Sequence, residues 1–152
     1  ENLRPQHILD ALLIPATDPA SEKLVLEEAE EDGRRYYVLI VLGTDGNGNL
    51  NLKRKIWFDR SNLEIARMQL YASAGVYLED VWYAAYEDFE GVRYPTRIQV
   101  SRPIEDYRLS INILKATFNR VIGPEKFELE RPEGAELVEL GAAPRAEETR
   151  GQ

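Results

Sequence analysis

Apolar and polar residues alternate in segment after segment between Leu24 and Leu129, and this alternation constrains the fold more than any other feature of the chain. Short turn sequences separate the segments, among them Asp32-Gly33, Asp45-Gly46, Ser61-Asn62 and Glu90-Gly91. A period of two is typical of strands that bury one face, and closely spaced turns join such strands into an antiparallel meander. A sheet this wide must curl around something, so its function depends on what the curled sheet holds.

The pattern predicts a mainly β (α+β) fold, a curved antiparallel sheet of about eight strands with one short N-terminal helix. The helix is expected over residues 4–13, where the apolar residues share one stripe and Pro5 suits the first turn. Between Ile65 and Met68 the alternation slips, as it does at a β-bulge. The expected strands cover residues 23–30, 34–43, 50–59, 63–72, 76–88, 92–102, 107–118 and 126–130.

The 152 residues suit one domain, which we expect over residues 1–140, followed by a flexible tail over residues 141–152. Because the chain opens at Glu1, with neither a signal peptide nor a membrane-spanning apolar run, we expect a trimmed or mature fragment. It contains no cysteine, which excludes disulfides and thiolate chemistry. Its 27 acidic and 19 basic residues give a net charge of -8, which repels a phosphate backbone. Nucleic acid is therefore not an expected partner.

The catalytic and metal-binding patterns in the chain all have a simpler structural explanation. His7 is the only histidine, which excludes a multi-histidine metal site. Asp80 or Asp88 with Glu79, Glu87 or Glu90 has the composition of an acid and base pair, but a solvated face explains these carboxylates better. The glycine-rich segment 43–48 lacks the Lys-Ser/Thr of a phosphate loop and the closing glutamate of a calcium loop, which favours a hairpin turn. We expect no catalytic residues, no metal and no cofactor.

Three of the expected strands carry one apolar and one polar face, whereas the strand over residues 34–43 is apolar on both faces. This strand indicates that its outer side is covered or forms an interface. One short helix covers too little area for the apolar face of the whole sheet. Part of that face must therefore meet further sequence, a partner or a ligand, and these alternatives remain open at this point.

Several segments, taken in order, resemble the LolA/LolB-like superfamily of outer-membrane lipoprotein-localisation proteins. A strand that ends in Asp59, Ile56-Trp57-Phe58-Asp59, is followed by Asn62-Leu63-Glu64-Ile65-Ala66-Arg67 and by Tyr71-Ala72-Ser73-Ala74-Gly75. Downstream, Gly91-Val92-Arg93-Tyr94-Pro95 is similar to a family strand start, and Thr117-Phe118-Asn119 and Phe127-Glu128-Leu129 are similar to its closing strands. The resemblance covers residues 56–137.

The resemblance implies an incomplete β-barrel whose concave side is plugged by helices and whose cavity holds acyl chains. It implies a non-catalytic protein that binds or transports lipids or lipoproteins in the bacterial envelope, either periplasmic or attached to the outer membrane. The implied partners are lipid or lipoprotein acyl chains, an envelope protein and a membrane surface. Family members usually carry a long helix and several strands ahead of the segment that resembles residues 4–13, and we expect this chain to lack them.

On this hypothesis the acyl chain of the ligand lies against apolar residues of adjacent strands. Each methylene group that is buried there makes the binding free energy more favourable by about 0.8 kcal/mol. We expect these residues to share the face that forms the groove. The alternative function is a protein interaction module that uses an exposed sheet edge and the doubly apolar strand over residues 34–43. The expected groove residues are Val38, Ile40, Leu42, Leu50, Leu52, Ile56, Phe58, Leu78, Trp82, Tyr86, Tyr94, Ile98, Val100, Leu109, Ile111 and Ile113.

Overall fold

The structure is a computed structural model of the chain, and it describes residues 4–44, 46–72, 75–121 and 123. The chain forms two units, residues 1–118 and residues 119–152. Of the second unit, residues 119–121 and 123 are described, and they contain no helix or strand. All helices and strands of the described residues lie in the first unit. The single domain over residues 1–140 and the flexible tail stay predictions.

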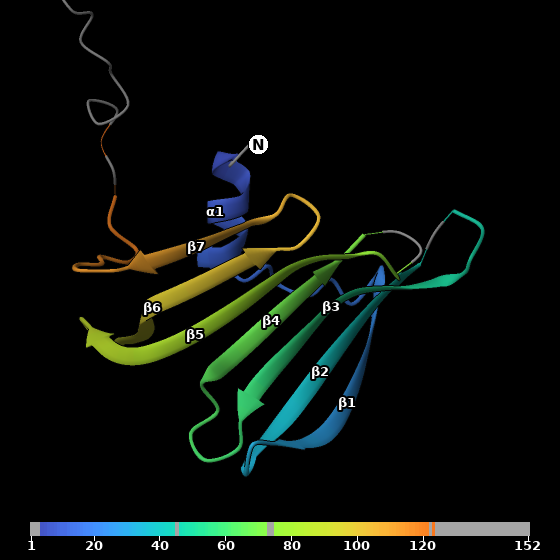
Figure 1. The fold of residues 1–152 in the computed structure, drawn as a ribbon, viewed down its shortest axis with the longest axis horizontal. Coiled ribbons are helices and arrows are strands. Elements are labelled where there is room, and N and C mark those ends of the chain that lie inside the picture. Colours follow the sequence, from blue (N-terminus) through green and yellow to red (C-terminus); the bar gives the residue numbers. More distant parts are fainter. Residues whose placement is uncertain (1–3, 45, 73–74, 122, 124–152) are drawn as a thin grey trace, which may run out of the picture. The chain divides into compact units, whose positions relative to one another are not determined.

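A seven-stranded antiparallel sheet makes up most of the first unit, and each strand pairs with the next along the chain. The sheet is twisted and bent (Figure 1), and β1 and β7 form its two edges. The predicted mainly β fold with a curved antiparallel sheet is confirmed, while the expected strand over residues 126–130 lies outside the described residues. The strands are β1 (Glu22–Glu31), β2 (Arg34–Thr44), β3 (Leu50–Asp59), β4 (Ile65–Tyr71), β5 (Tyr77–Phe89), β6 (Val92–Arg102) and β7 (Tyr107–Asn112).

Two of the predicted turns are two-residue hairpin loops: Asp32-Gly33 joins β1 to β2, and Glu90-Gly91 joins β5 to β6. Both residues of each loop have positive φ, 50° and 74° in the first and 55° and 89° in the second. Positive φ at both positions is typical of a type I′ turn, whose twist matches the right-handed twist of the strands. These loops fix the register of the two hairpins.

A β-bulge lies where the alternation slips between Ile65 and Met68. Trp57 of β3 pairs with Arg67 of β4, whereas the next residue, Phe58, pairs with Ile65, so Ala66 is the extra residue. Further register shifts occur between β2 and β3 and between β4 and β5. Because a bulge bends its strand and increases the local twist, these irregularities contribute to the curvature of the sheet.

The single described helix, α1 (Pro5–Leu12), agrees with the expected helix over residues 4–13, and a proline opens it. Its Ala11 is fully buried in a core cluster with residues of β3, β4, β5 and β6. The Tyr83 hydroxyl donates a hydrogen bond to the Ala11 carbonyl oxygen at 3.0 Å, and the Tyr94 hydroxyl donates one to that of Leu12. Two carbonyl groups that a helix end leaves without helical partners are thereby satisfied by the sheet.

The sheet buries side chains on both of its faces. The helix-side face, which packs against α1, carries the main core of Ile56, Met68, Val81, Tyr83, Ile98 and Val100. The opposite, outer face carries a smaller cluster of Tyr36, Val38 and Trp57, with Ala29, Ile40 and Ala66 packed against it. The doubly apolar strand is therefore β2, whose outer side is covered in part by neighbouring side chains of the same sheet.

The last described strand is shorter than expected, because it ends at Asn112 rather than at residue 118. Asn112 pairs with Arg97 of β6, and the backbone N–H of Ile113 still donates to the Thr96 carbonyl oxygen at 2.8 Å. The next residue of β6 in this direction is Pro95, which has no N–H group to donate. The ladder between β6 and β7 cannot continue past that proline in the usual pattern.

Candidate functional site

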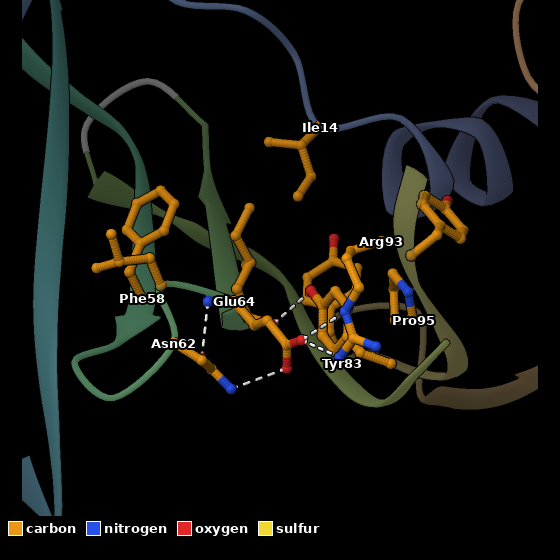
Figure 2. Close-up of a pocket in the computed structure, with 11 residues that line it drawn as sticks. Ile14, Phe58, Asn62, Glu64, Tyr83, Arg93 and Pro95 are labelled. Atoms are coloured by element: carbon orange, nitrogen blue, oxygen red, sulfur yellow. Dashed lines mark hydrogen bonds and ion pairs between the residues drawn. The ribbon is translucent and has the colours of Figure 1, made fainter. Parts of the chain in front are cut away.

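A largely apolar pocket lies on the helix-side face and has a volume of about 610 Å³. This volume falls within the range of about 300 to 1,000 Å³ typical of small-molecule sites. In Figure 2, Ile14 and Phe58 face the polar side chains of Asn62, Glu64 and Arg93 across the pocket. The lining residues are Ile14, Phe58, Asn62, Leu63, Glu64, Ile65, Tyr83, Tyr86, Arg93, Tyr94 and Pro95.

Three tyrosine side chains supply much of the pocket wall, and all three hydroxyl groups donate to backbone carbonyl oxygens. Tyr83 and Tyr94 donate to the end of α1, and Tyr86 donates to the Ile65 carbonyl oxygen at 2.8 Å. Burial raises the pKa of Tyr86 to about 12 and also raises the pKa values of Tyr83 and Tyr94. The rings therefore present an uncharged, largely apolar wall near neutral pH.

One rim of the pocket is polar. The Arg93 guanidinium donates to Glu64 through Nε, at 3.1 Å from Oε1, and also through Nη2. The Asn62 amide donates to the second carboxylate oxygen of Glu64 at 3.0 Å. Between them Leu63 has a φ of 60° and a side chain that is 62% exposed. The rim thus combines an ion pair with one exposed apolar side chain.

The apolar helix-side face continues beyond the pocket to the edge strand β1. Leu26 pairs in register with Leu39, and Leu24 pairs with Val41, so both β1 leucines lie on the helix-side face. Their side chains are 63% and 48% exposed. In Figure 1, α1 lies beside β6 and β7, whereas β1 and β2 extend away from it. The helix therefore leaves this part of the apolar face uncovered.

Buried charges close the other end of the helix-side face. Glu79 is fully buried and forms an ion pair with Arg102, which also binds Glu105 at 2.8 Å. Burial raises the pKa of Glu79, and the bond from Arg102 opposes that rise. Arg54 donates to Glu22 at 3.0 Å and to the Ala16 carbonyl oxygen at 3.2 Å, which ties the segment after α1 to the sheet. These contacts hold the helix and its following loop in place.

Of the acidic pairs considered from the sequence, Asp80 and Glu79 do not converge, and the expected solvated face is wrong for Glu79, which is fully buried. Asp80 accepts two hydrogen bonds of 2.7 Å from Arg67 on the outer face, whereas Glu79 points into the helix-side face. His7 bonds through Nδ1 to the Tyr107 hydroxyl at 2.8 Å, and burial lowers the pKa of the imidazole. Among the described residues, no group of three histidine or carboxylate side chains has the arrangement of a metal site.

The structure divides the sixteen expected groove residues between the two faces. Nine of them lie in or against the helix-side core: Ile56, Phe58, Tyr86, Tyr94, Ile98, Val100, Leu109, Ile111 and Ile113. Of these, Phe58, Tyr86 and Tyr94 line the pocket. Ligand binding by any of the sixteen stays a prediction.

The expectation that all sixteen share one face is wrong. Val38 and Ile40 belong to the outer-face cluster, and the register between β2 and β3 places Leu42 and Leu52 on the outer face as well. Trp82 also lies there, 43% exposed, with the Arg67 guanidinium 4.3 Å from its ring centroid. Leu50 is exposed opposite Thr44 at the end of its strand, and Leu78 is half-buried at a register shift. Because β2 is apolar on both faces, alternation could not tell its inner residues from its outer ones.

Eight pocket residues were absent from the expected set: Ile14, Asn62, Leu63, Glu64, Ile65, Tyr83, Arg93 and Pro95. Tyr83 could have been predicted from the sequence. It lies two residues after Val81 of the core on the same strand, so the two side chains point to the same face. The sequence predicts a turn at Ser61-Asn62 and a strand from residue 63, whereas β4 begins at Ile65. The place of residues 62–65 at the pocket mouth therefore depends on the curvature of the sheet.

No helix in the described part of the chain combines the length and the apolar character needed to span a membrane.

Comparison with known proteins finds similarity in structure alone. No protein-family model matches the chain, and no curated protein matches its sequence. A LolA superfamily protein from Nitrosomonas europaea is similar with a TM-score of 0.51 and 20% identity, over 73% of this chain and 50% of that one. A domain described as outer-membrane lipoprotein-sorting, from Vibrio parahaemolyticus, is similar with a TM-score of 0.53 and 15% identity, over 70% of this chain and 45% of that one. The chain spans about half the length of each.

The similarity to both neighbours lies in the fold, since their sequences are 20% and 15% identical to this chain. At these identities the similarity establishes the fold and leaves substrate and partners to be argued separately. The resemblance drawn from the sequence motifs is confirmed at this level: the chain has the fold of the LolA-like lipoprotein-sorting proteins.

Proposed function

We propose that this chain binds the acyl chains of lipids or lipoproteins, without catalysis, as a carrier in the bacterial envelope. The observation that carries the proposal is the pocket of about 610 Å³ on the helix-side face, walled by Phe58, Ile65 and three tyrosines whose hydroxyls are occupied. Periplasmic or outer-membrane-attached localisation is the setting that the LolA-like fold of the neighbours favours.

Affinity for an acyl chain requires apolar area and no directional chemistry. Each methylene that leaves water contributes about 0.8 kcal/mol, so ten methylenes contribute about 8 kcal/mol before the cost of association. That cost is roughly 4 kcal/mol or more, which leaves a binding strength suited to a carrier that must also release its cargo. A pocket that is open on one side fits this intermediate affinity.

The helix-side face extends from the pocket to the exposed leucines of β1, with the buried side chains of Val41 and Ile56 between them. The four strand spacings from β5 to β1 span about 19 Å, at about 4.8 Å per spacing. The hydrocarbon of one bilayer leaflet is about 15 Å thick, half of a core of about 30 Å. The span from the pocket to Leu24 and Leu26 is therefore as long as a fully extended acyl chain.

A substitution at Ile14 tests the proposal. Ile14 lines the pocket from the loop after α1, so Ile14→Glu places a carboxylate in the ligand space without altering a strand. We expect at least a tenfold loss of affinity for a single-chain lipid, measured by displacement of a fluorescent fatty probe, because an unpaired charge opposes an apolar ligand. Native mass spectrometry of the gently purified wild-type chain should show a bound species of lipid mass.

Trp82→Glu is the matched control, because it adds the same charge on the outer face beside Arg67. It should keep wild-type lipid affinity. Equal lipid binding by wild-type chain and Ile14→Glu, with unchanged circular dichroism, would refute the pocket as the binding site.

A second candidate function is an interaction module that docks a partner strand. The predicted docking strand over residues 34–43 corresponds to β2, which has neighbours on both sides, so the sheet edge beside it is β1. Leu24, Val25 and Leu26 of β1 have exposed side chains, and this observation favours the candidate. Oligomeric state as a function of concentration separates this function from lipid carriage.

A further inference from the structure

We propose that the pocket selects amphiphiles with a zwitterionic headgroup, because its rim holds one cation and one carboxylate that would engage the two charges of such a headgroup. The inference rests on the proposed function and names the class of lipid that the same pocket takes. It arises from Glu64 and Arg93, which form an ion pair with each other and both line the apolar pocket.

The two members of the pair are held differently. Glu64 is fixed by Asn62, whose amide donates to the carboxylate at 3.0 Å and whose Oδ1 accepts from the Glu64 backbone N–H at 2.9 Å. The Glu64 side chain is 22% exposed, whereas that of Arg93 is 56% exposed. Figure 2 shows the Glu64 carboxylate between Asn62 and Arg93. Arg93 is therefore the partner that can turn toward a ligand while the carboxylate stays in place.

The pair lies where an acyl chain in the pocket would end. Glu64 precedes Ile65, which pairs with Phe58 on the pocket wall, and Arg93 precedes Tyr94. Leu63, beside Glu64, holds a left-handed conformation that non-glycine residues rarely adopt. Its exposed side chain adds apolar surface at the mouth of the pocket. The rim thus brings apolar contact and both signs of charge together from two segments that are far apart in the sequence.

The pairing of charges decides which headgroup gains from this rim. When an anionic headgroup binds Arg93, Glu64 loses its ion-pair partner. The headgroup also places a second negative charge beside the Glu64 carboxylate, which is unfavourable. An uncharged headgroup leaves the pair intact and gains no charge-assisted bond. A headgroup with a phosphate and an ammonium group supplies a partner for each residue, because the phosphate binds the Arg93 guanidinium and the ammonium binds the Glu64 carboxylate.

Three single-chain lipids with one common acyl chain test the inference: a lysophosphatidylethanolamine, a lysophosphatidylglycerol and a monoacylglycerol. Titration calorimetry of the delipidated full chain, below the critical micelle concentration, gives each affinity. We expect the zwitterionic lipid to bind about tenfold more tightly than the other two, the factor that one charge-assisted hydrogen bond provides. Arg93→Gln should bring its affinity to the level of the monoacylglycerol.

Glu64→Gln keeps the shape of the rim and frees the Arg93 charge, so this variant should prefer the anionic lipid. Arg97→Gln is the matched control, because Arg97 is an exposed arginine of the same strand that lines no part of the pocket, and it should leave all three affinities unchanged. Wild-type affinities that are equal for the zwitterionic and uncharged lipids, or a preference that survives Arg93→Gln, would overturn the inference and leave acyl-chain binding standing. Failure of all three lipids to bind would instead refute the proposed function.

Discussion

At the scale of single residues, the Tyr83 hydroxyl links the pocket wall to the helix that partly covers it. Tyr83→Phe removes the bond to the Ala11 carbonyl oxygen and leaves that acceptor unpaired beside a fully buried side chain. We expect the free energy of unfolding to fall by about 1 to 3 kcal/mol, the cost of an unsatisfied buried polar group. Urea denaturation followed by circular dichroism measures the change.

The matched variant is Tyr71→Phe, whose hydroxyl bonds to the Gln69 side chain at 2.8 Å in a half-buried position. Solvent can replace that bond, so the expected loss is about 0.5 kcal/mol or less. Equal losses in the two variants would show that the Tyr83 hydroxyl does not anchor α1.

Single residues are also where the sequence was least informative. Glu64 and Arg93 are 29 positions apart, and they meet because the turn after β3 and the start of β6 reach the same end of the curved sheet. Each residue alone has the pattern of a solvated charge, and no local rule connects the two. Leu63 likewise gave no sign of its left-handed backbone, because leucine rarely adopts positive φ.

At the scale of the element, β1 tests whether the ligand extends beyond the pocket. Leu26 and Val25 are neighbours with exposed side chains on opposite faces, Leu26 on the helix-side face and Val25 on the outer face. Leu26→Glu should weaken binding of a long-chain lipid roughly fivefold, since a partly buried leucine contributes about 1 kcal/mol. Val25→Glu adds the same charge to the same strand and should leave lipid binding unchanged. Equal effects of the two variants, measured by probe displacement, would contradict a path along the helix-side face.

The strands themselves could be predicted within one or two residues wherever turn residues flank them, as at Asp32-Gly33 and Glu90-Gly91. Periodicity sorts the residues of a strand into two sets but does not name the set that faces inward. In β3 the sorting succeeded for Ile56 and Phe58 but failed for Leu52, because the register shifts between them. In β2 both sets are apolar, and Val38 was assigned to the wrong face. β7 ends early because Pro95 interrupts the pairing on its partner strand β6. The sequence does not show that Pro95 lies beside the end of β7 until the two strands are paired.

At the scale of the whole molecule, the meander was predictable because every strand pairs with its neighbour in sequence, so local turns determine the topology. The pocket was not predictable in the same way. Its lining comes from the loop after α1, from β3 through β6 and from the turns between them, and these parts converge only through the bulges and the twist of the sheet.

The charge of the whole molecule bears on whether β1 joins two copies of the chain. Strand β1 contains one lysine and five glutamates, Glu22, Glu27, Glu28, Glu30 and Glu31. Antiparallel pairing of two β1 strands would bring these carboxylates together in a chain of net charge -8, and like charges across a strand pair are destabilising. We therefore expect a monomer in sedimentation velocity at low salt over a wide range of protein concentration.

Salt provides the internal control for that expectation, because the Debye length falls from about 30 Å at 0.01 M to about 3 Å at 1 M ionic strength. If repulsion between β1 edges is what keeps the copies apart, high salt should permit weak association through Leu24, Val25 and Leu26. A concentration-dependent dimer already at low salt, with no change on delipidation, would favour the interaction module. A monomer that carries extractable lipid would favour the carrier, because its exposed leucines then serve the acyl chain rather than a second protein.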